Sequence, residues 1–210
     1  MVKKDQEIAG TPILSEIIKK SLAFLLLFSS ISLVLILITF NPLDTGWGIV
    51  SETLPTNLYK EIGAWLSGFI IKEFGVFPGL LLCLILFIWS LKLFNNSVIT
   101  FLKTKLSAIF LVIFLSSLGG TYLETVLVKT FNINFSIINQ RGLSEWFLLY
   151  LSNGLFNIFS IDLMTSELIL GVGSFFISLI LFSWILSLGP SEVKFIKFDF
   201  IMNILSITTT

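Results

Sequence analysis

The sequence predicts an all-α membrane protein with four transmembrane helices, amphipathic interfacial helices in the two outer loops, and both termini in the cytoplasm. Hydrophobic residues make up 55% of the 210 residues and charged residues only 12%, whereas roughly a quarter of a soluble domain is charged. Four apolar runs without any charge are each long enough to cross the hydrocarbon core, which takes about 17 to 25 residues. Lipid is therefore the solvent for most of this chain.

The first apolar run, residues 21–40, contains no charge, proline or glycine. At a rise of about 1.5 Å per residue, a helix of this length covers roughly 30 Å, the thickness of the hydrocarbon core. Its few polar side chains are serines and threonines, whose hydroxyls bond back to helix carbonyls. We predict a transmembrane helix here.

Residues 1–20 form a polar leader that ends in the basic pair Lys19 and Lys20. Because a basic pair beside a first span stays on the cytoplasmic side, we place the N-terminus in the cytoplasm. No small-x-small cleavage site follows the first run. We therefore expect an uncleaved anchor rather than a signal peptide.

The segment after the first run begins with NPLDTGWG, where Pro42 stops a helix and Gly46 and Gly48 indicate a turn. Apolar residues then recur at helical spacing over residues 58–70. This pattern predicts a short amphipathic helix at the outer membrane–water interface.

The second span comprises residues 74–91 and the third comprises residues 106–123. The connection between them, residues 92–105, holds three lysines and no acid. This excess of basic residues favours a cytoplasmic loop beside anionic lipid headgroups. Each basic residue near the membrane surface contributes about 1 kcal/mol of electrostatic attraction to it. Ahead of the second span, Glu61 and Glu73 are assigned to a solvated helix face rather than to an acid/base pair.

Residues 124–167 form the second outer segment, in which residues 143–161 are apolar enough to raise the question of a fifth span. The polar side chains of this stretch fall within roughly 140° of a helical wheel, which predicts an interfacial or re-entrant amphipathic helix. The last span comprises residues 168–189, so that residues 21–190 form the membrane domain. Residues 191–210 are the cytoplasmic juxtamembrane tail.

The distribution of basic residues supports this topology. The predicted inner segments hold nine lysines and arginines and the outer segments four, as the positive-inside rule requires. The two sides of the last span carry equal numbers of them, so charge alone does not fix its direction.

Several function classes are excluded or disfavoured by composition. Histidine is absent and Cys83 is the only cysteine, which excludes an intramolecular disulfide and a His/Cys zinc site. The net charge is zero, so we expect no direct nucleic-acid contact in this segment. The four predicted spans carry no ionisable residue, which disfavours an ion-coupled transporter, and no nucleophile lies beside a base. We predict no catalytic residue, metal or cofactor in this chain.

Three motifs appear in a fixed order around the first two spans. An aspartate and a tryptophan three residues apart follow the first span, then comes a Gly-Ala-aromatic-Leu segment, and a Phe-Gly pair opens the second span. The residues are Asp44 and Trp47, then Gly63, Ala64, Trp65 and Leu66, then Phe74 and Gly75. This arrangement resembles the N-terminal four-span domain of the FtsK/SpoIIIE DNA translocase family. Two features depart from it: Thr45 replaces a proline, and only Gly142 and Gly154 represent a glycine-rich second outer loop.

The resemblance implies a membrane anchor in the bacterial inner membrane, at the division septum and in contact with divisome proteins. It also implies a hexamer and a cytoplasmic motor that uses ATP and Mg²⁺ to move DNA during chromosome segregation. Residues 1–210 contain no G-x-x-x-x-G-K-[ST] phosphate loop, so they do not hydrolyse ATP by that route. The alternative is a small transporter or channel component unrelated to division.

Two sets of residues are candidates for interaction. Asp44 and Trp47 form either a recognition element for outer-face proteins or a turn whose tryptophan sits in the aromatic belt. Small residues four apart let helix backbones approach closely in lipid. They favour a packed bundle and a homo-oligomer, and the pairs are Gly75 with Gly79, Ser116 with Gly120, and Ser174 with Ser178.

Overall fold

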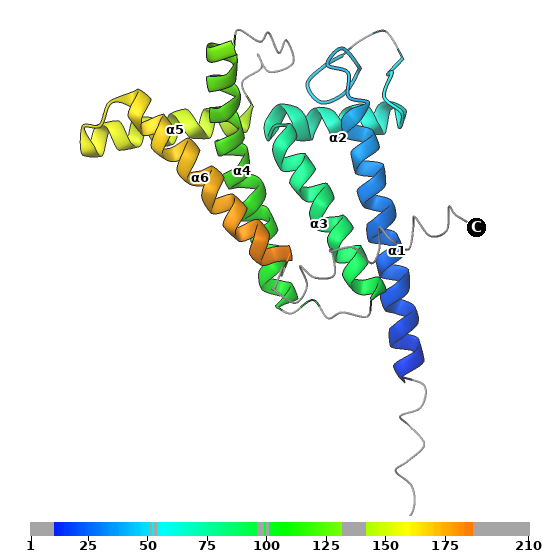
Figure 1. Cartoon of the computed structure of the whole chain (residues 1–210). Helices are drawn as coiled ribbons and strands as arrows, with labels where there is room; N and C mark the ends of the chain where they lie inside the picture. Colours follow the sequence, from blue (N-terminus) through cyan, green and yellow to red (C-terminus); the bar gives the residue numbers. More distant parts are fainter. Residues whose placement is uncertain are drawn as a thin grey trace, which may run out of the picture.

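The computed structural model describes residues 11–50, 52, 54–95, 99, 101–131 and 142–186. Within these residues the chain forms six helices and no strand, with one isolated β-bridge between Gly46 and Ile49. The helices are α1 (Thr11–Ile38), α2 (Lys60–Glu73), α3 (Val76–Phe94), α4 (Leu102–Phe131), α5 (Leu143–Phe159) and α6 (Leu163–Leu186) (Figure 1). The predicted all-α class is confirmed.

Four of these helices contain stretches long and apolar enough to cross a membrane. They are Glu16–Ile38, Val76–Phe94, Leu102–Leu123 and Leu163–Leu186. The predicted set of four spans is confirmed, and the chain is a multi-pass membrane protein. Each span contains charged residues, and all of them lie within five residues of a span end.

The start of α6 shows why charge is a poor guide to a helix end. α6 begins at Leu163, not at residue 168, because Asp162 caps its first turn. Thr165 donates its N–H to Oδ2 of Asp162 at 3.0 Å and its hydroxyl to Oδ1 at 2.6 Å. These hydrogen bonds lower the pKa of Asp162. Glu167, which set the sequence-based boundary, lies inside the helix and is half-buried.

The four long helices pack as two pairs. α1 packs mainly on α3, and α4 packs mainly on α6, while α3 joins the pairs by contacting α4 and α6. A buried apolar cluster fills the seam between the pairs, formed by Leu81, Ile85, Trp89, Val112, Ile185 and Leu186. The shorter helices α2 and α5 lie across one end of the bundle (Figure 1).

At the opposite end of the bundle, α3 holds the C-terminus of α6. The indole Nε1 of Trp89 donates to the carbonyl of Ile185 at 3.3 Å, and the Nζ of Lys92 donates to the carbonyl of Leu186 at 2.5 Å. The final carbonyls of a helix have no partner within it and carry partial negative charge, so an ammonium group stabilises them. The Nζ of Lys105 lies 5.9 Å from the ring centroid of Trp184, which adds a cation–π contact at this end.

The first pair of predicted packing glycines has two different roles. A Cβ on Gly79 would lie 3.0 Å from side-chain carbons of Ile70 and Leu37, so this glycine lets α3 pack closely against α2 and α1. Gly75 instead precedes α3 with a φ of 95°, a conformation that L side chains rarely adopt. Gly75 is therefore needed for the turn between α2 and α3.

The other predicted packing residues lie inside the bundle. Ser116, Ser174 and Ser178 are buried, and each hydroxyl donates to a carbonyl of its own helix. A Cβ on Gly120 would meet Phe77 of α3 at 3.8 Å. Because helices of the same chain occupy these faces, an oligomer would need other surfaces.

Sequence reasoning missed a close approach of two helices, α4 and α6. A Cβ on Gly119 would lie 2.6 to 2.9 Å from the Cβ, Cα and N of Phe175. A Cβ on Gly171 would collide with the side chain of Tyr122. Neither glycine has a small partner four residues away in the sequence, so spacing alone gives no signal for them.

We expect Gly119→Ala to destabilise the protein by roughly 1 to 3 kcal/mol, since the added methyl overpacks the α4–α6 contact. Gly173→Ala is the matched control, because its Cβ would meet nothing within 4 Å. Thermal unfolding in detergent measures both variants. Equal melting temperatures for the two would contradict the assigned contact.

Candidate functional site in the α1–α2 loop

The carboxylate of Asp44 lies at the centre of the loop between α1 and α2. Asp44 is 6% exposed. Its Oδ1 accepts the N–H of Thr56 at 2.9 Å and the hydroxyl of Thr56 at 3.0 Å, and its Oδ2 accepts the N–H of Asn57 at 2.9 Å. A buried carboxylate needs such donors to replace the water it loses. Asp44 therefore joins the beginning of the loop to its end, at Thr56 and Asn57.

Asn57 connects the closed loop to the end of α1. Its side-chain amide donates to the carbonyls of Ile36 at 3.0 Å and Thr39 at 3.1 Å, and its Oδ1 accepts the N–H of Tyr59 at 3.1 Å. The amide thus satisfies helix-end carbonyls that have no partner within α1. A Cβ on Gly63 would overlap Asn57 Oδ1, so glycine is required at position 63.

The rest of the Gly-Ala-Trp-Leu segment lies against the loop and the helix pair beneath it. A Cβ on Gly46 would lie 2.8 Å from the carbonyl oxygen of Ala64, which is itself buried. Leu66 packs on the cluster between α1 and α3. Trp65 is 49% exposed. The segment is thus the surface of α2 on which the loop rests.

Trp47 attaches the loop to the C-terminal half of α2. Its Nε1 donates to Oε1 of Glu73 at 2.6 Å, and its carbonyl accepts from Nζ of Lys72 at 3.1 Å. Its ring meets Trp65 and Phe69 edge-on, with centroids 5.3 and 4.9 Å apart. Burial lowers the pKa of Lys72, partly offset by the charge of Glu73. Aromatic pairs of this geometry contribute about 0.5 to 1.5 kcal/mol beyond their buried area.

Phe74 and Gly75 form the corner after α2. The ring of Phe74 packs edge-on against Phe69 at 5.6 Å. The N–H groups of Phe74 and Gly75 both donate to the carbonyl of Ile70, at 3.0 and 3.1 Å. This corner turns the chain from the crosswise α2 into the long α3 and places Glu73 beside the start of α5.

Glu73 joins the α1–α2 loop to the start of α5. While its Oε1 accepts from Trp47, its Oε2 accepts the N–H of Leu143 at 3.0 Å, at the start of α5. Gly142 packs directly against the carbonyl of Lys72, where a Cβ would not fit. The assignment of Glu73 to a solvated face is wrong, because this carboxylate is half-buried and bonded to Trp47 and Leu143. The partners lie 26 and 70 residues away, beyond the reach of helical periodicity.

Side chains with catalytic or metal-binding potential do not converge in the described part of the chain. It contains no group of three or more histidine, cysteine, aspartate or glutamate residues that could hold a metal ion. Both oxygens of Asp44 and of Glu73 are occupied by N–H or O–H donors of the protein. The arrangement is suited to holding backbone segments together.

The family model for the 4TM region of DNA translocase FtsK/SpoIIIE matches residues 15–135. The chain belongs to this family. The match covers more than half of the chain and includes Asp44, Trp47, the Gly-Ala-Trp-Leu segment and the Phe74–Gly75 corner. α5 and α6 follow the matched range. No curated protein and no solved structure gives a significant match to this chain.

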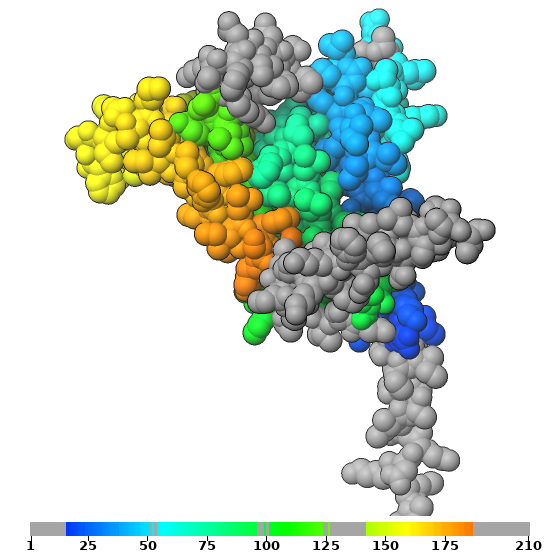
Figure 2. Space-filling model, in the orientation of Figure 1, coloured from blue at the N-terminus to red at the C-terminus, as the bar shows by residue number. Residues whose placement is uncertain are grey.

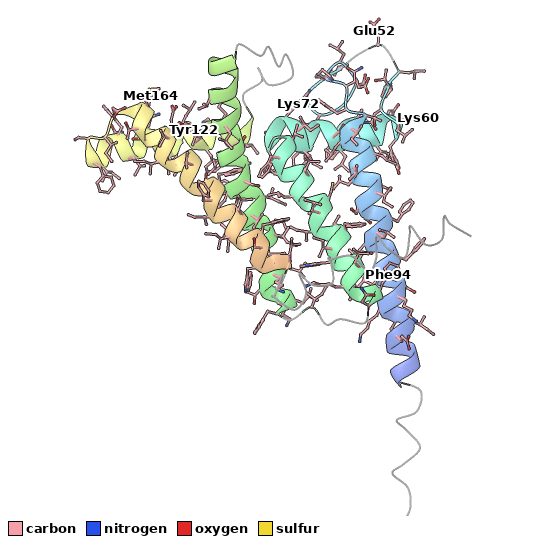
Figure 3. All side chains as sticks on the ribbon, viewed as in Figure 1. Glu52, Lys60, Lys72, Phe94, Tyr122 and Met164 are labelled. Atoms are coloured by element: carbon pink, nitrogen blue, oxygen red, sulfur yellow. The ribbon has the colours of Figure 1, made fainter. Side chains whose placement is uncertain are left out.

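In this FtsK/SpoIIIE 4TM region, Asp44→Ala should free the N–H groups of Thr56 and Asn57 inside a buried loop. An unsatisfied buried group costs about 1 to 3 kcal/mol. Hydrogen exchange is expected to accelerate at these two amides, with a lowered melting temperature. Glu52→Ala, at the exposed tip of the loop (Figure 3), is the control. Unchanged exchange in D44A would refute the assigned role.

The free energy of interaction between the Trp47 and Glu73 side chains can be measured by a double-mutant cycle. We expect Trp47→Phe and Glu73→Gln to show a coupling energy of about 0.5 to 3 kcal/mol, the range for residues in direct contact. Thermal unfolding of the two single variants and the double variant provides the values. Pairing Trp47→Phe with Glu61→Gln, at an exposed glutamate of the same helix, should give additive effects.

Proposed function

We propose that this chain is the membrane anchor of an FtsK-like DNA translocase that acts in bacterial cell division and chromosome segregation. The observation that carries the proposal is the family match over residues 15–135. The match is supported by the geometry of its motif residues: Asp44, Trp47 and Gly63 fold one loop against the span ends. The proposed location is the bacterial inner membrane, at the division septum.

The arrangement of the helix ends supports an orientation with both termini in the cytoplasm. The start of α1 and the end of α6 lie at the same end of the bundle, opposite α2 and α5 (Figure 1). Lys92 and Lys105 also lie near the end of α6. Lysines concentrate on the cytoplasmic side of membrane proteins, so α2, α5 and the α1–α2 loop would face outward.

In this orientation the motor would reside in the cytoplasm and the outer loops would face other division proteins. ATP and Mg²⁺ belong to the motor, and the anchor would bind neither cofactor nor nucleic acid. The likeness to the family suggests a homo-oligomer, with a hexamer as the proposed form. Its surroundings are membrane lipids on the flanks and divisome proteins at the outer end.

The α1–α2 loop carries apolar side chains suited to contact a division protein. Val50 is 97% exposed and Leu54 is 87% exposed, whereas the rest of the loop is held closed by Asp44. Ile62 on the adjacent α2 is 77% exposed. Exposed apolar side chains of this kind are found at protein contact sites. This surface is our proposed divisome contact.

The septal role predicts that a fluorescent fusion of the chain is enriched at the septum of dividing bacterial cells. Val50→Ser with Leu54→Ser should lose that enrichment and remain membrane-bound, because these side chains do not support the fold. Met164→Ser is the control, since Met164 is 78% exposed in the first turn of α6 (Figure 3). An even membrane distribution of the unaltered chain would contradict the division role. Normal enrichment of the Val50/Leu54 variant would contradict the contact site alone.

A transporter or channel component is the alternative, and the described residues offer no observation in its favour. The charged residues of the four spans all lie within five residues of a span end. Transport pathways are usually marked by ionisable groups near the middle of the membrane. Solute flux in proteoliposomes is the measurement that would revive this alternative.

A further inference from the structure

An open groove runs between α5 and the first turns of α6. Its volume is about 400 Å³, which is within the range of about 300 to 1,000 Å³ found for small-molecule sites. The walls are mainly apolar, with Leu151, Leu155 and Ile158 on α5 and Leu170 on α6. No charged residue lines the groove. Its occupant must therefore be largely apolar.

The position of the groove indicates what surrounds it. Leu170 is seven residues beyond the start of α6, which is about 10 Å along the helix axis. The groove thus lies between the crosswise α5 and Leu170 of a membrane-spanning helix. The neighbouring flank of α6 exposes Leu168 and Ile169, each nearly half accessible. This flank faces hydrocarbon, and it directly precedes the groove residue Leu170 in the sequence.

Lipid is the solvent that can fill this space. α5 projects sideways from the bundle (Figure 2), so a recess remains in the angle between it and α6. Water gains too few hydrogen bonds in an apolar recess to occupy it stably. An empty recess would forfeit dispersion contacts along its walls. A flexible hydrocarbon chain satisfies both conditions.

Polar groups lie at the groove where a lipid headgroup region would be expected. Asn153 and Asn157 stand one helical turn apart on α5, line the groove and are exposed. Their amides offer hydrogen-bond donors and acceptors without charge. Glycerol ester and phosphate oxygens are suitable acceptors for these donors.

We propose that this groove binds a membrane phospholipid, with one acyl chain between α5 and α6 and the glycerol ester region at Asn153 and Asn157. The inference does not depend on the proposed division role. It assigns a role to α5, a helix that lies outside the range matched by the family model.

Gly154 provides the test, because it lines the groove and a Cβ there would meet nothing within 4 Å. Gly154→Phe should fill the groove while leaving the helix in place. Gly173→Phe is the matched control: its Cβ also meets nothing within 4 Å, and it is not a groove residue. Equal melting temperatures of the two variants establish that both fold.

The probe is a phosphatidylethanolamine with a photoactivatable diazirine in its acyl chain, present in vesicles of phosphatidylethanolamine and phosphatidylglycerol. In the unaltered full chain, crosslinks should concentrate on residues 151–158 and Leu170. In G154F they should fall to the level of the lipid-facing flank of α1, while G173F keeps the original pattern. An even spread of crosslinks over all lipid-facing helices would overturn the proposal, and so would equal labelling of G154F and G173F.

A second measurement separates the headgroup contact from simple solvation of the groove by lipid. Native mass spectrometry of the chain released from the same vesicles should retain one phospholipid. Asn153→Leu with Asn157→Leu should lose it at lower collision energy while keeping the acyl-chain crosslinks. Identical retention in the variant and the unaltered chain would refute the role of the two asparagines.

Discussion

The shape of the loop end of this protein depends on one buried carboxylate. Asp44 accepts hydrogen bonds from N–H and O–H groups of Thr56 and Asn57, and the Asn57 amide donates to the carbonyls of Ile36 and Thr39 at the end of α1. A charge removed from water needs several donors, and Thr56 and Asn57 supply them to Asp44. The close fit of Gly63 beside Asn57 and the seating of Trp47 on α2 both presuppose this closed loop.

The same end shows how the two helix pairs are kept in register. The seam between them is apolar along most of its length, and apolar packing has little directional preference. Hydrogen bonds at the two ends of the seam are directional and fix the relative position of the helix pairs. Glu73 bonds Trp47 and Leu143 at one end, while Trp89 and Lys92 bond carbonyls of α6 at the other. These bonds fix how far one pair can slide past the other.

Much of the fold is predictable from composition, because a long uncharged run has few stable forms in lipid other than a helix. Helix ends are less predictable: Asp162 and Gly75 set two of them through a cap and a left-handed φ. The family motif is visible in the sequence, but the partners of Asp44 and Glu73 are not, since bonds over 12 to 70 residues leave no local pattern. Gly119 and Gly171 escaped notice for the same reason, because close approach depends on the opposite helix.

The bonds from Trp89 and Lys92 to the end of α6 have a mechanical consequence. Tension on the chain beyond Leu186 would reach the carbonyls that α3 holds before it could unwind α6 turn by turn. The load would pass through α3 to α1, which packs along it, and so be shared across the bundle. Four helices would then have to move together, and extraction would require far more work than drawing a single helix out of the bilayer.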